Sequence, residues 1–239
     1  LPLVFFFLGV TQPIVTYYLP SILAALGGNQ GIIIDPLMTQ QDGGQVIAAT
    51  LGSQFDQLGI MIIVISMMGI IQSDKANGML DFILTRPVKV ESYIGGKLFS
   101  NFSFVAISVT FGYLASYVYV NFLFSNIPFV DMLLAIVFYQ VWVLFMVSFT
   151  SMISTIFNGQ GVIALISIVS LLIFKMSSGL HPLVDILNPA GMSQQAMGVL
   201  ITGSIDSHLY GNMLITLVWI TLTVTVSHYW IAEKKYHKN

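Results

Sequence analysis

Residues 73–97 form a charged segment in an otherwise apolar chain, and the chemistry that they offer is recognition. Four of the eight Lys and Arg residues of the chain lie here, at Lys75, Arg86, Lys89 and Lys97. Apolar stretches long enough to cross a bilayer flank the segment on both sides. A chain that gathers its charge into one short loop presents that loop to a binding partner in the aqueous phase.

The residue patterns of common catalytic and metal sites are missing from the sequence. The four His residues are scattered and form no H-E-x-x-H pair, so we expect no metal or protease site. There is no G-x-S-x-G elbow and no G-x-x-x-x-G-K-[ST] phosphate loop. Without Cys the chain has no disulfide and no thiolate metal site. We therefore expect a chain that is not itself an enzyme.

The composition indicates that lipid is most of the solvent around this chain. Of its 239 residues, 56% are hydrophobic and 8% are charged, whereas about 25% are charged in an average soluble domain. The net charge of −2 gives no reason to expect nucleic-acid binding. The chain opens on Leu1-Pro2-Leu3 without Met, and we expect a short cytoplasmic segment to precede it in the full protein.

The apolar segments predict an all-α membrane protein in a single transmembrane domain, residues 1–239. A helix needs about 20 apolar residues to span the hydrocarbon core. Six segments reach about this length: 3–26, 51–71, 93–120, 130–156, 161–178 and 209–231. They lack the alternation of membrane β-strands, so we expect helices. Gly112 and Ser116 form a small-xxx-small pair that favours close helix packing within the chain.

The distribution of Lys and Arg predicts the orientation. Seven of the eight basic residues fall in the loop after the second span, at the start of the third span or in the tail after the sixth. Cytoplasmic loops carry such an excess, so both termini are expected in the cytoplasm of a multi-pass protein of the cell membrane. The long outer connection 179–208 mixes Pro and Gly with apolar runs. We expect it to form short re-entrant helices between spans 5 and 6.

The loop between spans 2 and 3, residues 73–92, predicts a short helix. Asn77 is a plausible N-cap for a helix that starts near Met79, and Asp81 would lie in its first turn. Pro87 disfavours helical geometry at Arg86, so the helix should end there. About two turns are not stable alone in water. The helix must dock on its own protein, on a partner or on the membrane face, where it would be an ordinary interfacial helix.

The same loop resembles the cytoplasmic loop of ABC-2 type transporter permeases, the membrane subunits of bacterial ABC exporters. That loop has an acid four residues before a Gly-Thr pair, then Leu-acid, an apolar pair, Pro-Val-basic and a Gly-Lys. The matching residues, in order, are Asp74, Gly78, Leu80, Asp81, Pro87, Val88, Lys89, Gly96 and Lys97. Met79 replaces the usual Thr, and Ala76 stands where a second acid is common. The six-span layout extends the resemblance to nearly the whole chain.

The resemblance implies a coupling helix that docks in a groove of a cytoplasmic ATP-binding subunit. Two ATPase subunits would bind ATP and Mg, two permease chains would pair as a homodimer or heterodimer, and this chain would bind no cofactor itself. The residues expected at this coupling site are Asp74, Lys75, Gly78, Met79, Asp81, Phe82, Ile83, Arg86, Pro87 and Lys89. Among them Asp74, Lys75, Arg86 and Lys89 are expected to make polar contacts, and Met79, Phe82 and Ile83 the apolar contact.

Three polar residues within or beside the spans are candidates for a substrate path. Asp56 and its neighbour Gln57 precede the apolar part of span 2. Asp56 lies either at the outer boundary of the hydrocarbon or on such a path, since a buried acid is costly. Lys175, near the outer end of span 5, is expected to snorkel to the headgroups. It could instead pair with Asp185 or Asp206, or contact an anionic group of a substrate.

The function that these features favour is export of an amphipathic or hydrophobic substrate, such as a peptide or a lipid-like or drug-like molecule. Two other hypotheses stay open at this point. One is a membrane scaffold or sensor subunit that binds a cytoplasmic partner without transport. The other is an ion-driven secondary carrier, which would need buried ionisable residues along its path.

Overall fold

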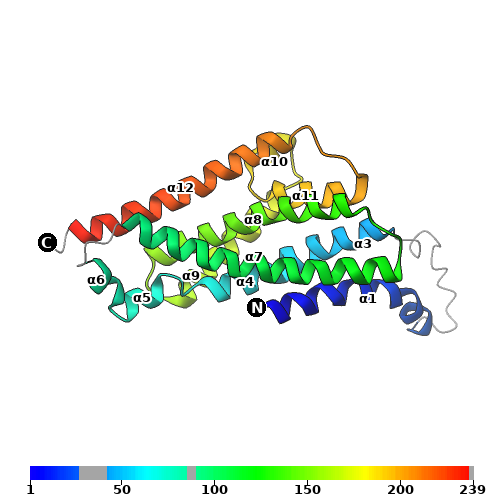
Figure 1. The fold of residues 1–239 in the computed structure, drawn as a ribbon, viewed down its shortest axis with the longest axis horizontal. Helices are drawn as coiled ribbons and strands as arrows, with labels where there is room; N and C mark the ends of the chain where they lie inside the picture. The colour runs from blue at the N-terminus through cyan, green and yellow to red at the C-terminus, as the bar shows by residue number, and fades with distance from the viewer. Residues whose placement is uncertain (27–41, 85–89, 237–239) are drawn as a thin grey trace.

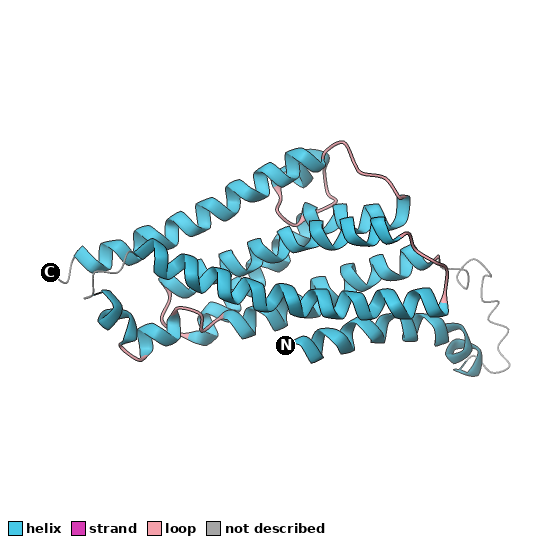
Figure 2. Cartoon of the chain, viewed as in Figure 1, coloured by secondary structure: helices cyan, strands magenta, loops and turns pink. Residues whose placement is uncertain are grey.

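The computed structural model describes residues 1–26, 42–84 and 90–236, and in these residues the only regular structure is helical. Figure 1 shows an elongated bundle in which the long helices run along the long axis, and Figure 2 shows the helices joined by short loops. The prediction of an all-α fold is confirmed.

The helices comprise six segments that are long and apolar enough to span a membrane, as predicted. Five of the six are α1 (Pro2–Leu26), α7 (Val90–Leu123), α8 (Phe129–Ile156), α9 (Gln160–Ser177) and α12 (Leu209–Tyr236). The second span is composite and contains α3 (Gly43–Ala49), η1 (Thr50–Gly59), α4 (Ile60–Met67) and α5 (Gln72–Ala76). The short helices are α6 (Met79–Leu84), α10 (Pro182–Leu187) and α11 (Gly191–Thr202).

One end of the bundle carries α5, α6, the start of α7 and the end of α12, on the left in Figure 1. We call it the basic end, because Lys75, Lys97, Lys234 and Lys235 belong to these elements. The predicted topology places this end in the cytoplasm.

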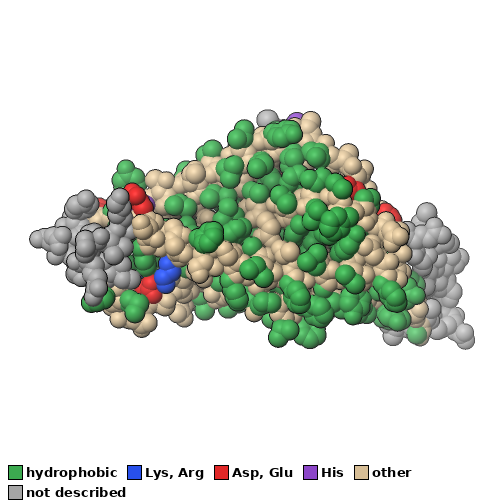
Figure 3. All heavy atoms as spheres, in the orientation of Figure 1, with side chains coloured by type: hydrophobic (Ala, Val, Ile, Leu, Met, Phe, Trp, Pro, Cys, Tyr) green, Lys and Arg blue, Asp and Glu red, His purple; other side chains and the backbone are tan. Residues whose placement is uncertain are grey.

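Helix α8 is the centre of the bundle. It has the largest buried share of the six spans, whereas α1 and α9 have the smallest. Its side chains Trp142 and Phe145 stack at 5.6 Å between ring centroids, and Phe145 meets Phe174 of α9 and Trp219 of α12 edge to face. Figure 3 shows apolar side chains over the middle of one face and charged ones toward its two ends. This distribution suits a surface that faces lipid.

The second span begins earlier than predicted. Asp42 caps α3 by accepting a hydrogen bond from the Gly43 amide at 2.9 Å, and Ser125 donates to Asp42 at 2.5 Å. The helix therefore starts at Gly43 rather than near residue 51, and Asp56 lies well inside it. The middle part, η1, is a π-helix of 10 residues. Because π-helices are rare and are mostly single turns at functional sites, this stretch is unusual.

The connection before α12 contains two short helices, α10 and α11. The apolar residues Met192, Ala196 and Val199 of α11 are buried, where the helix packs against α8 and α3. The sequence predicted short helices in this connection, and a re-entrant position in the bilayer stays a prediction.

The corner between α5 and α6 differs in detail from the prediction. Asn77 does not cap α6; it closes α5, and its amide donates to the Ser73 carbonyl at 3.0 Å. The α6 helix instead starts after Gly78, whose carbonyl accepts from the Phe82 amide at 3.3 Å. Gly78 has φ +69°, a conformation that favours glycine. The chain needs this glycine to turn sharply between the two helices.

Helices α1 and α7 touch through two glycines. A Cβ atom on Gly9 would lie 2.0 Å from the Gly112 carbonyl oxygen, and one on Gly112 would lie 2.3 Å from the Phe5 carbonyl oxygen. Ser116, one turn beyond Gly112, shares a hydrogen bond of 3.1 Å with Thr50. The predicted packing role of Gly112 and Ser116 within one chain is confirmed.

We expect Gly112→Ala to lower the free energy of unfolding by about 1–3 kcal/mol, because the methyl group meets backbone that has little freedom to move. Gly95→Ala on the same helix is the control, since a Cβ atom there has no neighbour within 4 Å. It should leave stability unchanged or raise it by up to about 1 kcal/mol through helix propensity. Unfolding in mixed micelles titrated with SDS measures both. Equal effects would contradict the close contact.

Candidate functional site

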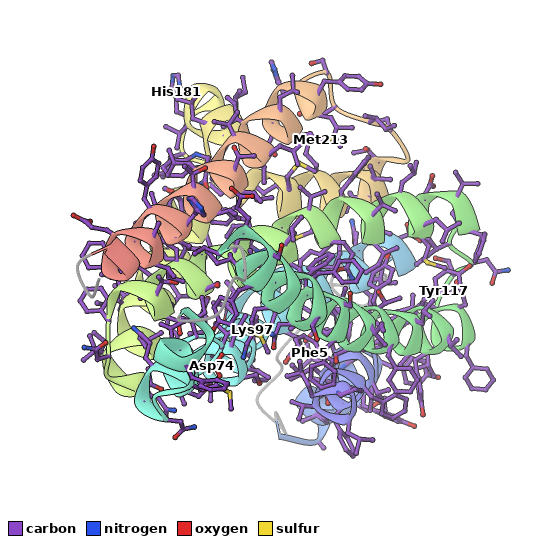
Figure 4. The ribbon with its side chains drawn as sticks, turned by 60° about the vertical axis from the view of Figure 1, so that its left-hand side comes forward. Phe5, Asp74, Lys97, Tyr117, His181 and Met213 are labelled. Carbon is purple, nitrogen blue, oxygen red and sulfur yellow. The ribbon has the colours of Figure 1, made fainter. Side chains whose placement is uncertain are left out.

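Asp74 fastens α5 to the base of α7. Its side chain is largely buried, and its Oδ2 atom accepts a hydrogen bond from the Tyr93 hydroxyl at 2.6 Å and pairs with Lys97 Nζ at 2.8 Å. Tyr93 and Lys97 are four residues apart, so they lie on one face of α7. Figure 4 shows Asp74 and Lys97 together at the basic end. Charge-assisted contacts of this kind are strong and directional.

Ser154 fastens the other side of the same corner to α8. Its hydroxyl oxygen accepts from the amides of Ile71 at 3.3 Å and Gln72 at 3.0 Å, and the hydroxyl donates to the Met68 carbonyl at 3.0 Å. The Gln72 side chain also donates to the Asn158 carbonyl at 2.8 Å. The break between α4 and α5 leaves backbone groups without helical partners, and Ser154 satisfies them.

Lys75 completes the contact with α8. Its ammonium group donates to the Thr155 carbonyl at 3.0 Å and to the Phe157 carbonyl at 2.5 Å. These carbonyls belong to the C-terminal end of α8, where the helix dipole favours a cation. The corner of α5 is thus held by polar contacts to two spans, α7 and α8.

Helix α6 presents apolar side chains on its outer side. Leu80 is buried at 4% exposure, whereas Met79 is 55% and Phe82 is 57% exposed. The inner side therefore anchors this short helix to the bundle. The outer side carries large apolar groups next to a rigid corner, which is a surface suited to docking.

The residues predicted for coupling differ in the contacts that the structure shows for them. Asp74 and Lys75 make the internal contacts described above, so at least part of their hydrogen-bonding capacity is used within the chain. Gly78 shapes the turn, and Met79 and Phe82 are exposed. The side chains of Asp81 and Ile83 are outside the described part of α6, and Arg86, Pro87 and Lys89 lie outside the described residues altogether. Contact of any of them with an ATPase stays a prediction.

A second polar cluster lies inside the bundle, and we call Asp56, Tyr139, Lys175 and Ser193 the buried ion-pair cluster. Asp56 has 0% exposure. Its Oδ2 atom is 2.5 Å from Lys175 Nζ, and its Oδ1 atom accepts from the Tyr139 hydroxyl at 3.0 Å. The Ser193 hydroxyl donates to Asp56 Oδ2, and Lys175 donates to Ser193 at 3.2 Å. The four side chains come from η1, α8, α9 and α11.

This cluster corrects the prediction for Lys175. Lys175 does not snorkel away from the bundle; it turns inward, because the unpaired charge of Asp56 would be costly where it is buried. Asp56 lies well inside the helical segment that begins at Gly43, and its position relative to the hydrocarbon boundary stays a prediction. Gln57, the third candidate for a substrate path, is exposed on the outside of η1. A substrate path through these residues stays a prediction.

The two acids proposed as alternative partners of Lys175 have other contacts. Asp185 accepts from the Gly179 amide at 2.5 Å. Asp206 accepts from the His208 amide at 3.2 Å, and this hydrogen bond holds the pKa of the Asp206 carboxyl below its ordinary value. Both acids therefore shape the connection between α9 and α12. In the ranges 1–26, 42–84 and 90–236, no three His, Asp or Glu residues are grouped as metal ligands.

Comparison with known proteins agrees with a multi-pass membrane protein. The family model described as ABC-2 family transporter protein matches residues 4–234. The chain belongs to the ABC-2 family of transporter proteins. It is also 30% identical over 227 residues to the uncharacterized transmembrane protein YxlG of Bacillus subtilis (strain 168), covering 95% of this chain and 87% of the relative. The chain is thus a multi-pass membrane protein of a family that supplies the permease subunits of ABC transporters.

We expect the Asp74–Lys97 pair to stabilise the corner. Lys97→Met should lower the free energy of unfolding by about 1–2 kcal/mol, less than for a fully buried pair because the Lys97 side chain is 33% exposed. Adding Asp74→Asn to Lys97→Met should lower the free energy of unfolding only a little further, because the double variant has no unpaired charge at this position. Unfolding titrations of wild type, both single variants and the double variant measure the coupling. Additive effects of the two changes would show that the pair is not coupled.

Proposed function

We propose that this chain is the membrane permease subunit of an ABC-2 type exporter that moves an amphipathic or hydrophobic substrate. Two permease chains, as a homodimer or a heterodimer, work with two copies of a cytoplasmic ATPase that bind ATP and Mg. The substrate is a peptide or a lipid-like or drug-like molecule. Membership of the family supports the permease role, and the remaining parts rest on the site.

The observation that carries the proposal is the exposed apolar side of α6. Met79 and Phe82 face outward on a helix that is too short to be stable alone. Large exposed apolar side chains beside charged residues are typical of protein-binding surfaces. The position of α6 between two spans is the position at which the resemblance places a coupling helix.

The corner behind α6 supports a transmission role. A displacement of α6 would be passed to α5 across the Gly78 turn. Helix α5 is held to α7 through Asp74 and to α8 through Ser154 and Lys75. These hydrogen bonds and the ion pair are directional, so the spans would follow α5 rather than slide past it. Closure of two ATPase subunits below would then rock the paired bundles.

The proposed substrate class rests on the character of the spans. Each of the six candidate spans has a strongly apolar stretch with no more than two charged residues. The buried pair of Asp56 and Lys175 is neutral as a unit. A free ion would find few charged partners along such helices, whereas an amphipathic molecule would find apolar surface.

The experiment that tests the proposal is native purification of the tagged chain in mild detergent, followed by mass spectrometry of the co-purified proteins. A stoichiometric ATP-binding subunit is the expected result. A folded chain that brings down no ATPase would overturn the proposal in favour of a scaffold or an ion-driven carrier. Transport that needs a cation gradient and no ATP would identify the carrier.

We expect Phe82→Asp to reduce the co-purified ATPase at least about tenfold, because a charge would replace an aromatic side chain that the proposed ATPase contact would bury. A tenfold loss corresponds to about 1.4 kcal/mol of binding free energy. Ala76→Asp is the matched control. It adds the same charge at an exposed position of α5, where an acid is common in the family loop. Membrane insertion, measured by the yield of monodisperse protein, should be unchanged in both. Equal ATPase recovery with Phe82→Asp and wild type would refute the coupling assignment.

A further inference from the structure

We propose that the buried ion-pair cluster is a reversible closing contact, which is made in the state seen here and opens when the ATPase binds ATP. Asp56 and Lys175 are then positioning residues of the transport cycle. This inference rests on the proposed function for its trigger, and the contact itself is open to a test that needs no ATPase.

The first argument is the set of elements that the cluster joins. Asp56 belongs to η1 of the second span, Lys175 to α9, Tyr139 to α8 and Ser193 to α11. The hydroxyl of Ser193 donates to Asp56 and accepts from Lys175, so α11 is held at the centre of the pair. Separation of the pair would remove the polar contacts that hold α9 and α11 to η1, while the packing of α11 on α3 remains.

The second argument is the path from the basic end to Asp56. The second span runs from Gly43 to Ala76 with one turn at residues 68–71, so α5, α4 and η1 follow one another without a long loop. Asp56 lies on the same segment as Asp74, the residue that fastens the corner to α7. A displacement at α6 would therefore reach the ion pair along a single span, whose turn at residues 68–71 is held to α8 by Ser154.

The third argument is the π-helix that carries Asp56. All 10 residues from Thr50 to Gly59 are in this wider helix, whose hydrogen bonds run from i to i+5. Conversion of part of it to α-helix would turn the residues around the axis and carry Asp56 away from Lys175. A π-helix at the position of a buried charge points to a segment that can adopt two conformations, one π-helical and one partly α-helical.

The fourth argument is the free-energy cost of separating the two charges, which keeps the contact closed unless water or another polar group replaces the partner. Each charge of the pair is satisfied by the other, by Ser193 and, for Asp56, by Tyr139. In a low-dielectric interior the charges separate only where water or another polar group replaces the partner. Opening of the cluster is thus the same event as entry of water at this depth of the bundle.

Amine-reactive labelling tests the opening in the wild-type chain. The purified permease–ATPase complex in lipid nanodiscs is treated with a water-soluble N-hydroxysuccinimide ester, without nucleotide and with ATP trapped by a hydrolysis-deficient ATPase. Mass spectrometry of the Lys175 peptide gives the modified fraction, and the other Lys peptides report general reactivity. We expect at least a tenfold rise at Lys175 with trapped ATP. Equal modification in the two states, whether low or high, would overturn the proposal.

Cysteine labelling tests the contact itself in the permease alone. The chain has no Cys, so a cysteine at Ala196, which has 0% exposure on α11, reports water entry through maleimide labelling. With Lys175→Met, the labelling rate of Ala196→Cys should rise about tenfold. With Lys175→Arg, which keeps the charge, it should stay close to wild type. Equal rates for the Met and Arg variants would contradict the closing role.

A second reporter separates opening from unfolding. Val109→Cys replaces a residue with 0% exposure on α7, which contributes no side chain to the cluster. It should stay protected with Lys175→Met if only this contact opens. Labelling of both reporters would mean a structural role and would overturn the proposal. If no ATPase co-purifies, the proposed function fails, but the cysteine result still decides whether the cluster closes the bundle.

Discussion

A charged group inside this bundle has to be paired within the protein, because the lipid hydrocarbon offers neither hydrogen bonds nor charge. The six spans are built from a chain with 8% charged residues, and two polar assemblies are organised around this constraint. One is the corner at which α5 is held to α7 through Asp74 and to α8 through Lys75 and Ser154. The other is the pair of Asp56 and Lys175 with its hydroxyl partners.

Both assemblies contact α8, the most buried of the spans. Its last turns provide Ser154 and the carbonyls that bind Lys75, and Tyr139 of the same helix donates to Asp56. The second span also takes part in both. Two helices thus connect the surface at the basic end with a charged contact deep in the bundle, and the remaining helices pack around them.

The exposed side of α6 and the buried pair have different roles in the proposed cycle. The first is apolar and accessible, so it suits a partner that binds and moves. The second is charged and enclosed, so it suits a contact that is either made or broken. The glycine contact of Gly9 with Gly112 is different again, because backbone packed at such short range leaves α1 and α7 little room to separate. Motion is therefore easier to accommodate at α9, which lacks such a glycine contact among the described residues, than at α1.

The sequence by itself determined the class of the molecule and indicated where the proposed partner surface lies. Runs of about 20 apolar residues leave a helix as the available structure in lipid, and the spacing of Asp74, Gly78, Pro87 and Lys97 was sufficient to indicate the family loop. Such features depend on neighbours along the chain. The role of Gly112 in close packing was visible for the same reason, as a local small-residue pattern.

The tertiary structure alone decided which polar groups meet. Lys175 was expected at the headgroups, yet it binds Asp56, a fully buried acid on a different span. Nothing in the local sequence singled out Ser154, Ser193 or Tyr139, because serine and tyrosine are common in membrane helices and gain a role only from a partner across the bundle. The start of the second span at Gly43 was missed because it depends on Asp42 and on Ser125, which a distant loop brings to it. Pairing of charges in lipid is a long-range condition, so it is settled by how the helices pack and not by the order of the residues.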